Sequence, residues 1–193
     1  MISAIILAAG QSKRMGQPKM LLPWGKLTVI EKVIITFLDA KVQEIVVVTG
    51  GARELVEKIL EGYPVRKIHN KDYATGEMLS SIQDGLRAMS NQTPAALIGL
   101  GDQPQVQEQT IRLICETYRE SGFSLIVPSF QMRRGHPWLV ARPLWGEILA
   151  LKSPESPRDF LNRHAADIHY VNVRTPSILA DLDTPEDYQQ SHP

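Results

Sequence analysis

Short apolar runs alternate with amphipathic stretches along the first 128 residues of the chain. An uninterrupted apolar run of this kind is typical of a strand that is buried on both faces of a parallel sheet. Such runs predict five strands, at residues 2–8, 44–49, 64–69, 95–100 and 123–128.

The stretches between these strands carry apolar residues at the spacing of a helix with one buried face. Thr28 and Glu31 precede the first of them at the spacing of a capping box. Cys115 falls on such a face and is expected in the core rather than as a catalytic thiol. The four inward faces are expected to be Ile30, Val33, Ile34, Phe37 and Leu38, then Leu55, Val56, Ile59 and Leu60, then Leu79, Ile82, Leu86 and Met89, and finally Ile111, Ile114, Cys115 and Tyr118.

After residue 128 the alternation is less regular. Trp138-Leu139-Val140 predicts a returning strand, residues 144–151 a short helix, and residues 168–173 an edge or antiparallel strand. Thr184 followed by Pro185 predicts the start of a last helix. The whole order predicts an α/β fold of three layers, a mostly parallel twisted sheet with helices on both faces. Ligands of such folds bind at the carboxyl ends of the strands.

The composition is that of an ordinary soluble protein and excludes several kinds of partner. With 193 residues, 43% of them hydrophobic, the chain is expected to form one domain, residues 1–193. Twenty-one basic residues balance twenty-one acidic ones, so no overall field favours nucleic acid or an anionic membrane. No apolar run approaches the ~20 residues of a membrane span, and the N-terminus does not read as a signal peptide. The single cysteine fits a cytoplasmic protein.

The most distinctive stretch, residues 7–19, directly follows the first predicted strand. Its alanines and glycines allow the backbone to approach a ligand closely, as a phosphate-binding loop requires. Four basic residues occur between residues 10 and 26 with no acidic residue among them: Lys13, Arg14, Lys19 and Lys26. A basic loop at the carboxyl end of a buried strand indicates a polyphosphate site. The alternative is a solvated connection with ordinary surface lysines.

The spacing within this stretch excludes two other phosphate-binding loops. Five residues separate Gly10 from Gly16, and Gln17 follows, so the P-loop pattern G-x-x-x-x-G-K-[ST] is not met. The Gly-x-Gly of the dinucleotide-binding fingerprint is absent as well.

What residues 7–19 do match is Leu-Ala-Ala-Gly-x-Ser-x-Arg-Met-Gly-x-x-Lys. In this motif the chain resembles the NTP transferases that include the molybdenum-cofactor cytidylyl- and guanylyltransferases. The resemblance implies a nucleotide-diphospho-sugar transferase-like (Rossmann-like) fold, with a nucleotide-binding half at residues 1–104 and an acceptor-binding half at residues 105–193. It also implies catalytic roles for Arg14 and Lys19. The nucleotide-binding residues that it implies here are Leu7, Ala8, Ala9, Gly10, Ser12, Arg14 and Lys19.

Two aspartates are candidate ligands of Mg²⁺. Asp102 follows a buried strand in Gly-Asp-Gln-Pro, where a carboxylate can hold Mg²⁺ against phosphate oxygens, although a turn aspartate bonded to its own backbone explains it equally well. Asp183 lies in Asp-Leu-Asp-Thr-Pro-Glu-Asp, where acids also favour a helix N-terminus. Both segments resemble motifs of the family, which implies metal binding by Asp102 and Asp183, nucleotide contact by Gly101, and a weaker role for Asp181.

A serine at a helix start is the candidate contact for the base. Residues 76–86 resemble the segment that helps to hold the pyrimidine in cytidylyltransferases of this fold, and Ser81 matches its serine best, with Ser80 as the fallback. Such a serine is more often a helix cap. Asn70 is implied to contact the nucleotide by the same resemblance. Ala9 favours CTP, because the resembling guanylyltransferases tend to have glycine there.

The family motifs expected near the acceptor are only partly present in this sequence. Arg134-Gly135-His136-Pro137 resembles a Gly-His-Pro motif near the acceptor, although a histidine before proline can simply be a turn residue. The family's Gly-Asp-x-Gly-Ala-Arg segment is replaced at residues 153–161, where only Arg158 survives. These motifs therefore leave the identity of the acceptor open.

The resemblance implies transfer of CMP from CTP to a molybdopterin-type molybdenum cofactor, with release of pyrophosphate and with Mg²⁺ as cofactor. A molybdoenzyme or its maturation factor would receive the product. Three alternatives stay open: a transferase that uses GTP or another phosphorylated acceptor, an NAD(P)H-dependent oxidoreductase on the same scaffold, and a binding module without activity.

Overall fold

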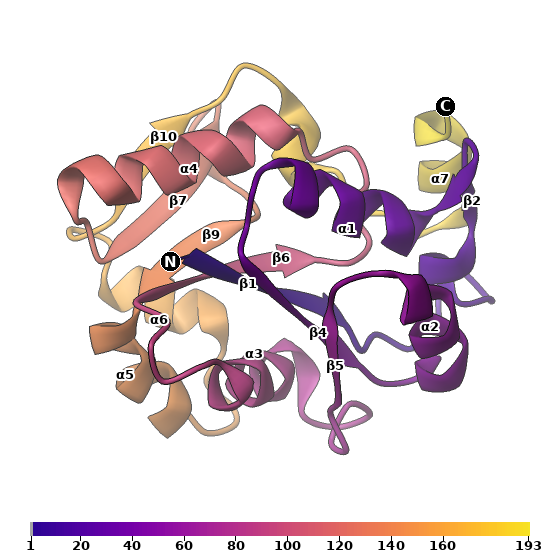
Figure 1. Cartoon of the computed structure of the whole chain (residues 1–193), viewed down its shortest axis with the longest axis horizontal. Helices are drawn as coiled ribbons and strands as arrows, with labels where there is room; N and C mark the ends of the chain where they lie inside the picture. Colours follow the sequence, from indigo (N-terminus) through magenta and orange to yellow (C-terminus); the bar gives the residue numbers. More distant parts are fainter. Residues whose placement is uncertain (1) are drawn as a thin grey trace.

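An eight-stranded mixed sheet forms the centre of the computed structural model, which describes residues 2–193 (Figure 1). Its strands lie in the order β10-β7-β9-β6-β1-β4-β5, and β8 pairs with β7. Four strands, β6, β1, β4 and β5, are mutually parallel, whereas β9 is antiparallel to both β6 and β7. The strands are β1 (Ile2–Ala8), β4 (Glu44–Thr49), β5 (Arg66–His69), β6 (Ala95–Leu100), β7 (Leu125–Phe130), β8 (Arg133–Arg134), β9 (Trp138–Ala141) and β10 (His169–Asn172).

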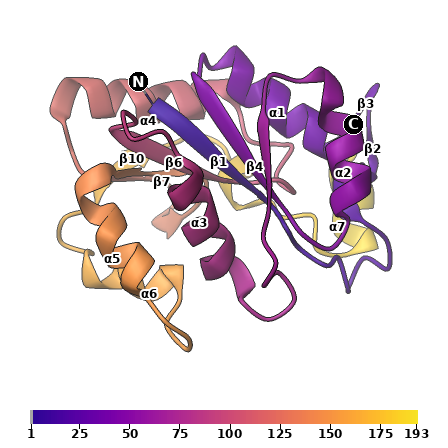
Figure 2. The ribbon, with the colours of Figure 1, turned by 60° about the horizontal axis from the view of Figure 1, so that its bottom comes forward.

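Helices cover both faces of this sheet, as Figures 1 and 2 show. On one face lie α1 (Val29–Asp39), α2 (Arg53–Ile59) and α4 (Glu108–Ser121). On the other lie α3 (Glu77–Ala88), α5 (Trp145–Ala150) and α6 (Pro157–Arg163). The C-terminal helix α7 (Pro185–Ser191) instead lies beside a small hairpin of β2 (Pro23–Trp24) and β3 (Leu27–Thr28). Short 3-10 turns occur at Lys19–Leu21, Leu60–Gly62, Arg142–Leu144 and Pro176–Leu179.

The alternation of side chains along β1 explains the two cores. Ala4 and Ile6 belong to the cluster under α1 and α4, while Ile5 and Leu7 belong to the cluster under α3 and α5. All seven residues of β1 are buried, as expected of a central parallel strand. At Gly85 a Cβ atom would lie 2.4 Å from Ile5 Cγ2, so this glycine allows α3 to pack directly on the strand.

The predicted fold class is confirmed, and so are the predicted bounds of β4 and β6. The capping box of α1 is present, with the Thr28 hydroxyl accepting from the Glu31 amide and the Glu31 carboxylate accepting from the Thr28 amide. Cys115 is 2% exposed, and burial raises its thiol pKa to about 11, so the prediction of a core cysteine is confirmed.

Four details differ from prediction. The strand β5 begins at Arg66, two residues later than expected. The strand β7 begins at Leu125, because Phe123 before it lies at the surface and is 43% exposed. Leu55 also points outward, with 53% of its surface exposed, since α2 is short and buries only Val56. The strand β10 is an edge strand as expected, but it runs parallel to β7. Within residues 2–193, no helix is both long enough and apolar enough to cross a membrane.

Candidate active site

A cavity of about 390 Å³ lies at the carboxyl ends of β1 and β6. Five segments form it: the loop after β1, the loop after β5, the start of α3, the turn after β6, and the segment before α7. Parallel strands β1 and β6 are direct neighbours, so the loops that follow them meet at one edge of the sheet. The cavity is therefore where the fold class leads one to expect a ligand site.

The loop after β1 is held in its shape by Ser12. This residue adopts a left-handed conformation (φ 52°), and its carbonyl accepts hydrogen bonds from the amides of Met15 and Gly16, both at 3.1 Å. Its hydroxyl accepts a hydrogen bond of 3.1 Å from the Lys19 amide. Ser12 therefore folds the loop back on itself, and Lys19 is fixed where its side chain enters the cavity.

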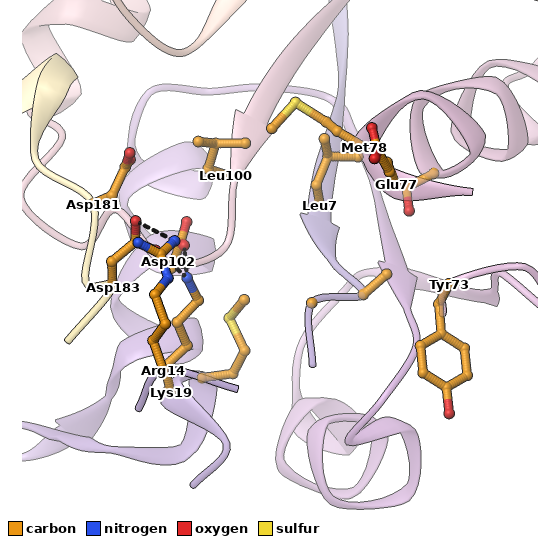
Figure 3. Close-up of a pocket in the computed structure, with 14 residues that line it drawn as sticks. Leu7, Arg14, Lys19, Tyr73, Glu77, Met78, Leu100, Asp102, Asp181 and Asp183 are labelled. Carbon is orange, nitrogen blue, oxygen red and sulfur yellow. Dashed lines mark hydrogen bonds and ion pairs between the residues drawn. The ribbon is translucent and has the colours of Figure 1, made fainter. Parts of the chain in front are cut away.

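Two basic and two acidic side chains meet on one side of the cavity (Figure 3). Lys19 Nζ pairs with Asp102 and also lies 3.2 Å from Asp183 Oδ1. Arg14 Nη2 lies 2.7 Å from Asp183 Oδ2. The fold thus brings Asp102 and Asp183 together from distant parts of the chain, and the two predicted catalytic cations join them.

The carboxylate of Asp183 can face the cavity because neighbouring residues, and not Asp183, cap the helix α7. Thr184 caps α7, with its hydroxyl accepting from the Asp187 amide, and the Asp187 carboxylate completes the capping box. Next to Asp183, Leu182 is fully buried, and its amide donates to the Asp102 carbonyl at 3.3 Å. This buried leucine anchors the C-terminal segment beside the turn after β6.

Negative charge is concentrated at this side of the cavity. Burial, and then the nearby charge of Asp102, raises the pKa of Asp181. Burial alone would lower the pKa of Lys19, but the charge of Asp102 and hydrogen bonds to Asp102 and Asp183 outweigh it and raise that pKa. The ammonium of Lys19 therefore stays charged at neutral pH and balances carboxylates that repel one another.

The donor set fits a hard divalent cation bound together with a phosphate. Asp102 and Asp183 offer carboxylate oxygens, which Mg²⁺ prefers. Among residues 2–193, no group of three or more His, Cys, Asp or Glu side chains is arranged to hold a metal ion. Mg²⁺ commonly takes only one or two protein carboxylates and completes its shell with water and substrate phosphate. The two aspartates could therefore hold such an ion jointly with a bound polyphosphate.

Several predicted nucleotide-binding residues line the cavity, and others do not. Leu7, Ala9, Gly10 and Ser81 do, whereas Ser12 lines an adjoining hollow. Three lie outside the cavity wall: Ala8 is buried within β1, Gly101 packs against Leu7 and Met20, and Asn70 is fully buried.

Asn70 instead holds the first turns of α3 in place through hydrogen bonds from its buried side chain. Its side-chain amide donates to Ser80 Oγ at 2.8 Å and to Ser81 Oγ at 2.9 Å. Its carbonyl oxygen accepts from the Asp72 amide at 2.8 Å. One buried side chain thus fixes both serines and the loop before them.

Replacing Asn70 by alanine is expected to loosen the position of Ser81. The two hydroxyls and the Asp72 amide lose a buried partner, so the free energy of unfolding should fall by about 1–3 kcal/mol. We expect the KM for the nucleotide to rise more than kcat falls, because the cations and carboxylates stay in place. Chemical denaturation and steady-state kinetics measure both effects, with the exposed Asn172→Ala as control. An unchanged KM would contradict this link between Asn70 and the nucleotide.

The wall opposite the charged cluster comes from three residues that were not among the predicted contacts, although two of them lie within the segment of residues 76–86. Tyr73, Glu77 and Met78 line it (Figure 3). Glu77 begins α3 in a left-handed conformation, with φ 50°. Their placement after β5, at the same edge of the sheet, is the signal that could have identified them.

A second cavity, of about 780 Å³, adjoins the first, and Glu77 and Met78 line both. Three of the four residues predicted to bind the acceptor line the second cavity: Arg134, Gly135 and His136. The fourth, Pro137, is buried and does not line it. Burial lowers the pKa of His136, against the opposing effects of the Ile98 carbonyl and Asp102, so its ring is neutral at pH 7.

Known proteins resemble the chain along nearly its whole length. Molybdenum cofactor cytidylyltransferase of Escherichia coli (strain K12) is 32% identical over 188 residues, which cover 97% of this chain and 93% of that protein. Nicotine blue oxidoreductase of Paenarthrobacter nicotinovorans is 28% identical over 192 residues, covering 96% and 93% respectively. The matches thus include a transferase and an oxidoreductase.

Solved structures agree with the fold. The crystal structure of Rv0371c from Mycobacterium tuberculosis H37Rv is 25% identical, with a TM-score of 0.86 over 98% of this chain and 96% of that one. The same mycobacterial protein has been solved in a complex with manganese, at 24% identity and a TM-score of 0.79 over 99% and 97% of the two chains. The sequence profile of the MobA-like NTP transferase domain matches residues 4–168. The chain therefore belongs to the MobA-like NTP transferase domain family.

Proposed function

We propose that this nucleotidyltransferase, which is cytidylyltransferase-like, transfers CMP from CTP to a molybdopterin-type molybdenum cofactor. A phosphate oxygen of the acceptor attacks the α-phosphorus of CTP, the new P–O bond forms as the bond to pyrophosphate breaks, and pyrophosphate leaves. The observation that carries the proposal is the meeting of Asp102, Asp183, Arg14 and Lys19 at one cavity.

The chain's own groups supply positioning and charge. In this proposal the amides of residues 9–12 bind triphosphate oxygens, and Arg14 and Lys19 neutralise the charge that develops on pyrophosphate. Both cations currently pair with carboxylates, so they are already held within reach of the same ligand. Mg²⁺ held by Asp102 and Asp183 would supply further stabilisation of negative charge on the phosphates. Phosphate is itself a competent nucleophile, so no covalent step on the protein is required.

The two cavities match a reaction of two substrates. We assign the first, formed mainly by residues 1–104, to the nucleotide and the second, formed mainly by residues 105–193, to the acceptor. Ala9 and Ser81, the two residues on which the expectation of CTP rests, both line the first cavity, which supports CTP. A molybdoenzyme or its maturation factor is the proposed recipient of the product.

An oxidoreductase is the second candidate, because nicotine blue oxidoreductase is similar over nearly the whole chain. The clustered cations and carboxylates favour the transferase, since a triphosphate with a divalent cation uses both signs of charge. Hydride transfer gives no comparable reason for two aspartates to converge on Lys19.

Pyrophosphate release measured with CTP, GTP and ATP, with and without molybdopterin-type acceptor and with Mg²⁺, tests the proposal. We expect release that depends on the acceptor and on Mg²⁺ and that is fastest with CTP. Preference for GTP would overturn the assignment of the base, and release without acceptor dependence would overturn that of the acceptor. Oxidation of NAD(P)H in the absence of pyrophosphate release would instead support the oxidoreductase.

A further inference from the structure

Arg134 is held in a fixed orientation at the edge of the second cavity. It lies in the short strand β8, and its side chain reaches two other elements. Nε donates to the Tyr170 hydroxyl of β10 at 2.8 Å, and Nη1 donates to Asn162 Oδ1 of α6 at 2.8 Å. The guanidinium is thus oriented by residues of two other elements, and both residues also line the cavity.

Both partners of Arg134 are neutral. By contrast, Arg14, Arg66 and Arg163 each pair with a carboxylate. The ion pairs formed among the residues that the structure describes do not include Arg134 or Arg158. A hydroxyl and an amide orient the guanidinium without cancelling its charge, so it remains available to an anion.

The rest of the cavity supports an anionic ligand with an apolar body. Arg158, the arginine that survives in the altered segment at residues 153–161, also lines it, and Glu77 is the one acidic residue among its lining side chains. Met78, Trp138 and Leu161 supply apolar wall. A flat ring packs well against such side chains.

We infer that Arg134, oriented by Tyr170 and Asn162, binds the phosphate group of a ring-bearing acceptor in the second cavity. Tyr170 and Asn162 are positioning residues in this assignment, and Arg158 adds a second positive charge. The inference deepens the proposed function, on which it rests for the presence of an acceptor in this cavity. It also explains how an acceptor site can persist although residues 153–161 depart from the family pattern.

The decisive variant is Asn162→Asp, which keeps the shape of the side chain and its contact with Arg134 but places a negative charge there. The probe is 1-naphthyl phosphate, with 1-naphthol as its uncharged counterpart, titrated calorimetrically into the full chain. The first cavity is filled beforehand with Mg²⁺ and a non-hydrolysable CTP analogue. Arg134→Gln serves as a second variant, and Asn91→Asp, exposed in the turn before β6, as the control of equal charge change.

We expect wild type and Asn91→Asp to bind naphthyl phosphate alike, and Asn162→Asp and Arg134→Gln to bind it about tenfold more weakly, as for the loss of a charge-assisted hydrogen bond. Naphthol should bind weakly and equally to all four. A purely structural cluster would tolerate Asn162→Asp, because a new ion pair with Arg134 preserves it. Unchanged binding by Asn162→Asp, or equal binding of naphthol and its phosphate by wild type, would overturn the inference. Because no turnover is measured, the result is independent of which acceptor the enzyme uses.

Discussion

Asp102→Asn is expected to lower kcat for pyrophosphate release by about a hundred- to a thousandfold, a range typical of the loss of one group that stabilises transition-state charge. The carboxamide has nearly the shape of the carboxylate but carries no charge to hold Mg²⁺. The fold should persist, since Lys19 keeps its contact with Asp183. Release assays at saturating CTP, with the melting temperature as the check of folding, measure the effect.

The matched control for this variant is Asp84→Asn. Asp84 is an aspartate of α3 that pairs with Arg87 at 3.1 Å and does not line the first cavity. Its replacement should leave kcat within about twofold, as for a surface ion pair of small energetic weight. If Asp102→Asn released pyrophosphate as fast as the wild type, the assignment of Asp102 to the metal would be wrong.

Lys19→Met is expected to lower kcat/KM by about a hundredfold, because methionine keeps the apolar stem but cannot neutralise a triphosphate. The free energy of unfolding should also fall by about 2 kcal/mol, between the values for exposed and buried pairs, since Asp102 loses its cation. The pKa of Lys19 is raised above 10.5. The stabilisation is therefore complete at neutral pH and disappears as the pH rises through that raised pKa.

Denaturation of the wild type and of Lys19→Met, at pH 7 and at strongly alkaline pH, measures the difference in their free energies of unfolding. The control is Lys26→Met. Lys26 is exposed in the turn between β2 and β3, so its replacement should change neither activity nor stability. Equal stability of Lys19→Met and the wild type at pH 7 would contradict a stabilising role of the cation among these carboxylates.

Much of the fold could be predicted because it depends on local pattern. The apolar runs identified β4 and β6 to the residue, and the spacing of Thr28 and Glu31 identified the start of α1. The direction of β10 could not be predicted, because the pattern of a strand does not specify its partner, and residues 169–172 pair in parallel with β7. Leu55 was misplaced because helical spacing does not tell how wide a face the sheet will cover.

The candidate site likewise contains parts that the sequence identifies and parts that only the fold determines. The loop at residues 7–19 carries its own signature, whereas the pairing of Arg14 with Asp183 joins residues far apart in sequence and depends on the packing of Leu182. The buried support that Asn70 gives to two serines was likewise out of reach, because a side chain's hydrogen bonds follow from tertiary contacts. Local motifs identified the groups, and the fold determined their partners.

The shared wall at Glu77 and Met78 has a kinetic consequence for the proposed reaction. The dinucleotide product would occupy both cavities as one molecule, so binding of its second half would benefit from a high effective concentration. We therefore expect the product to be held more tightly than either substrate. Its departure would then limit turnover, and a protein that takes it directly from the enzyme would speed the cycle without touching the chemistry.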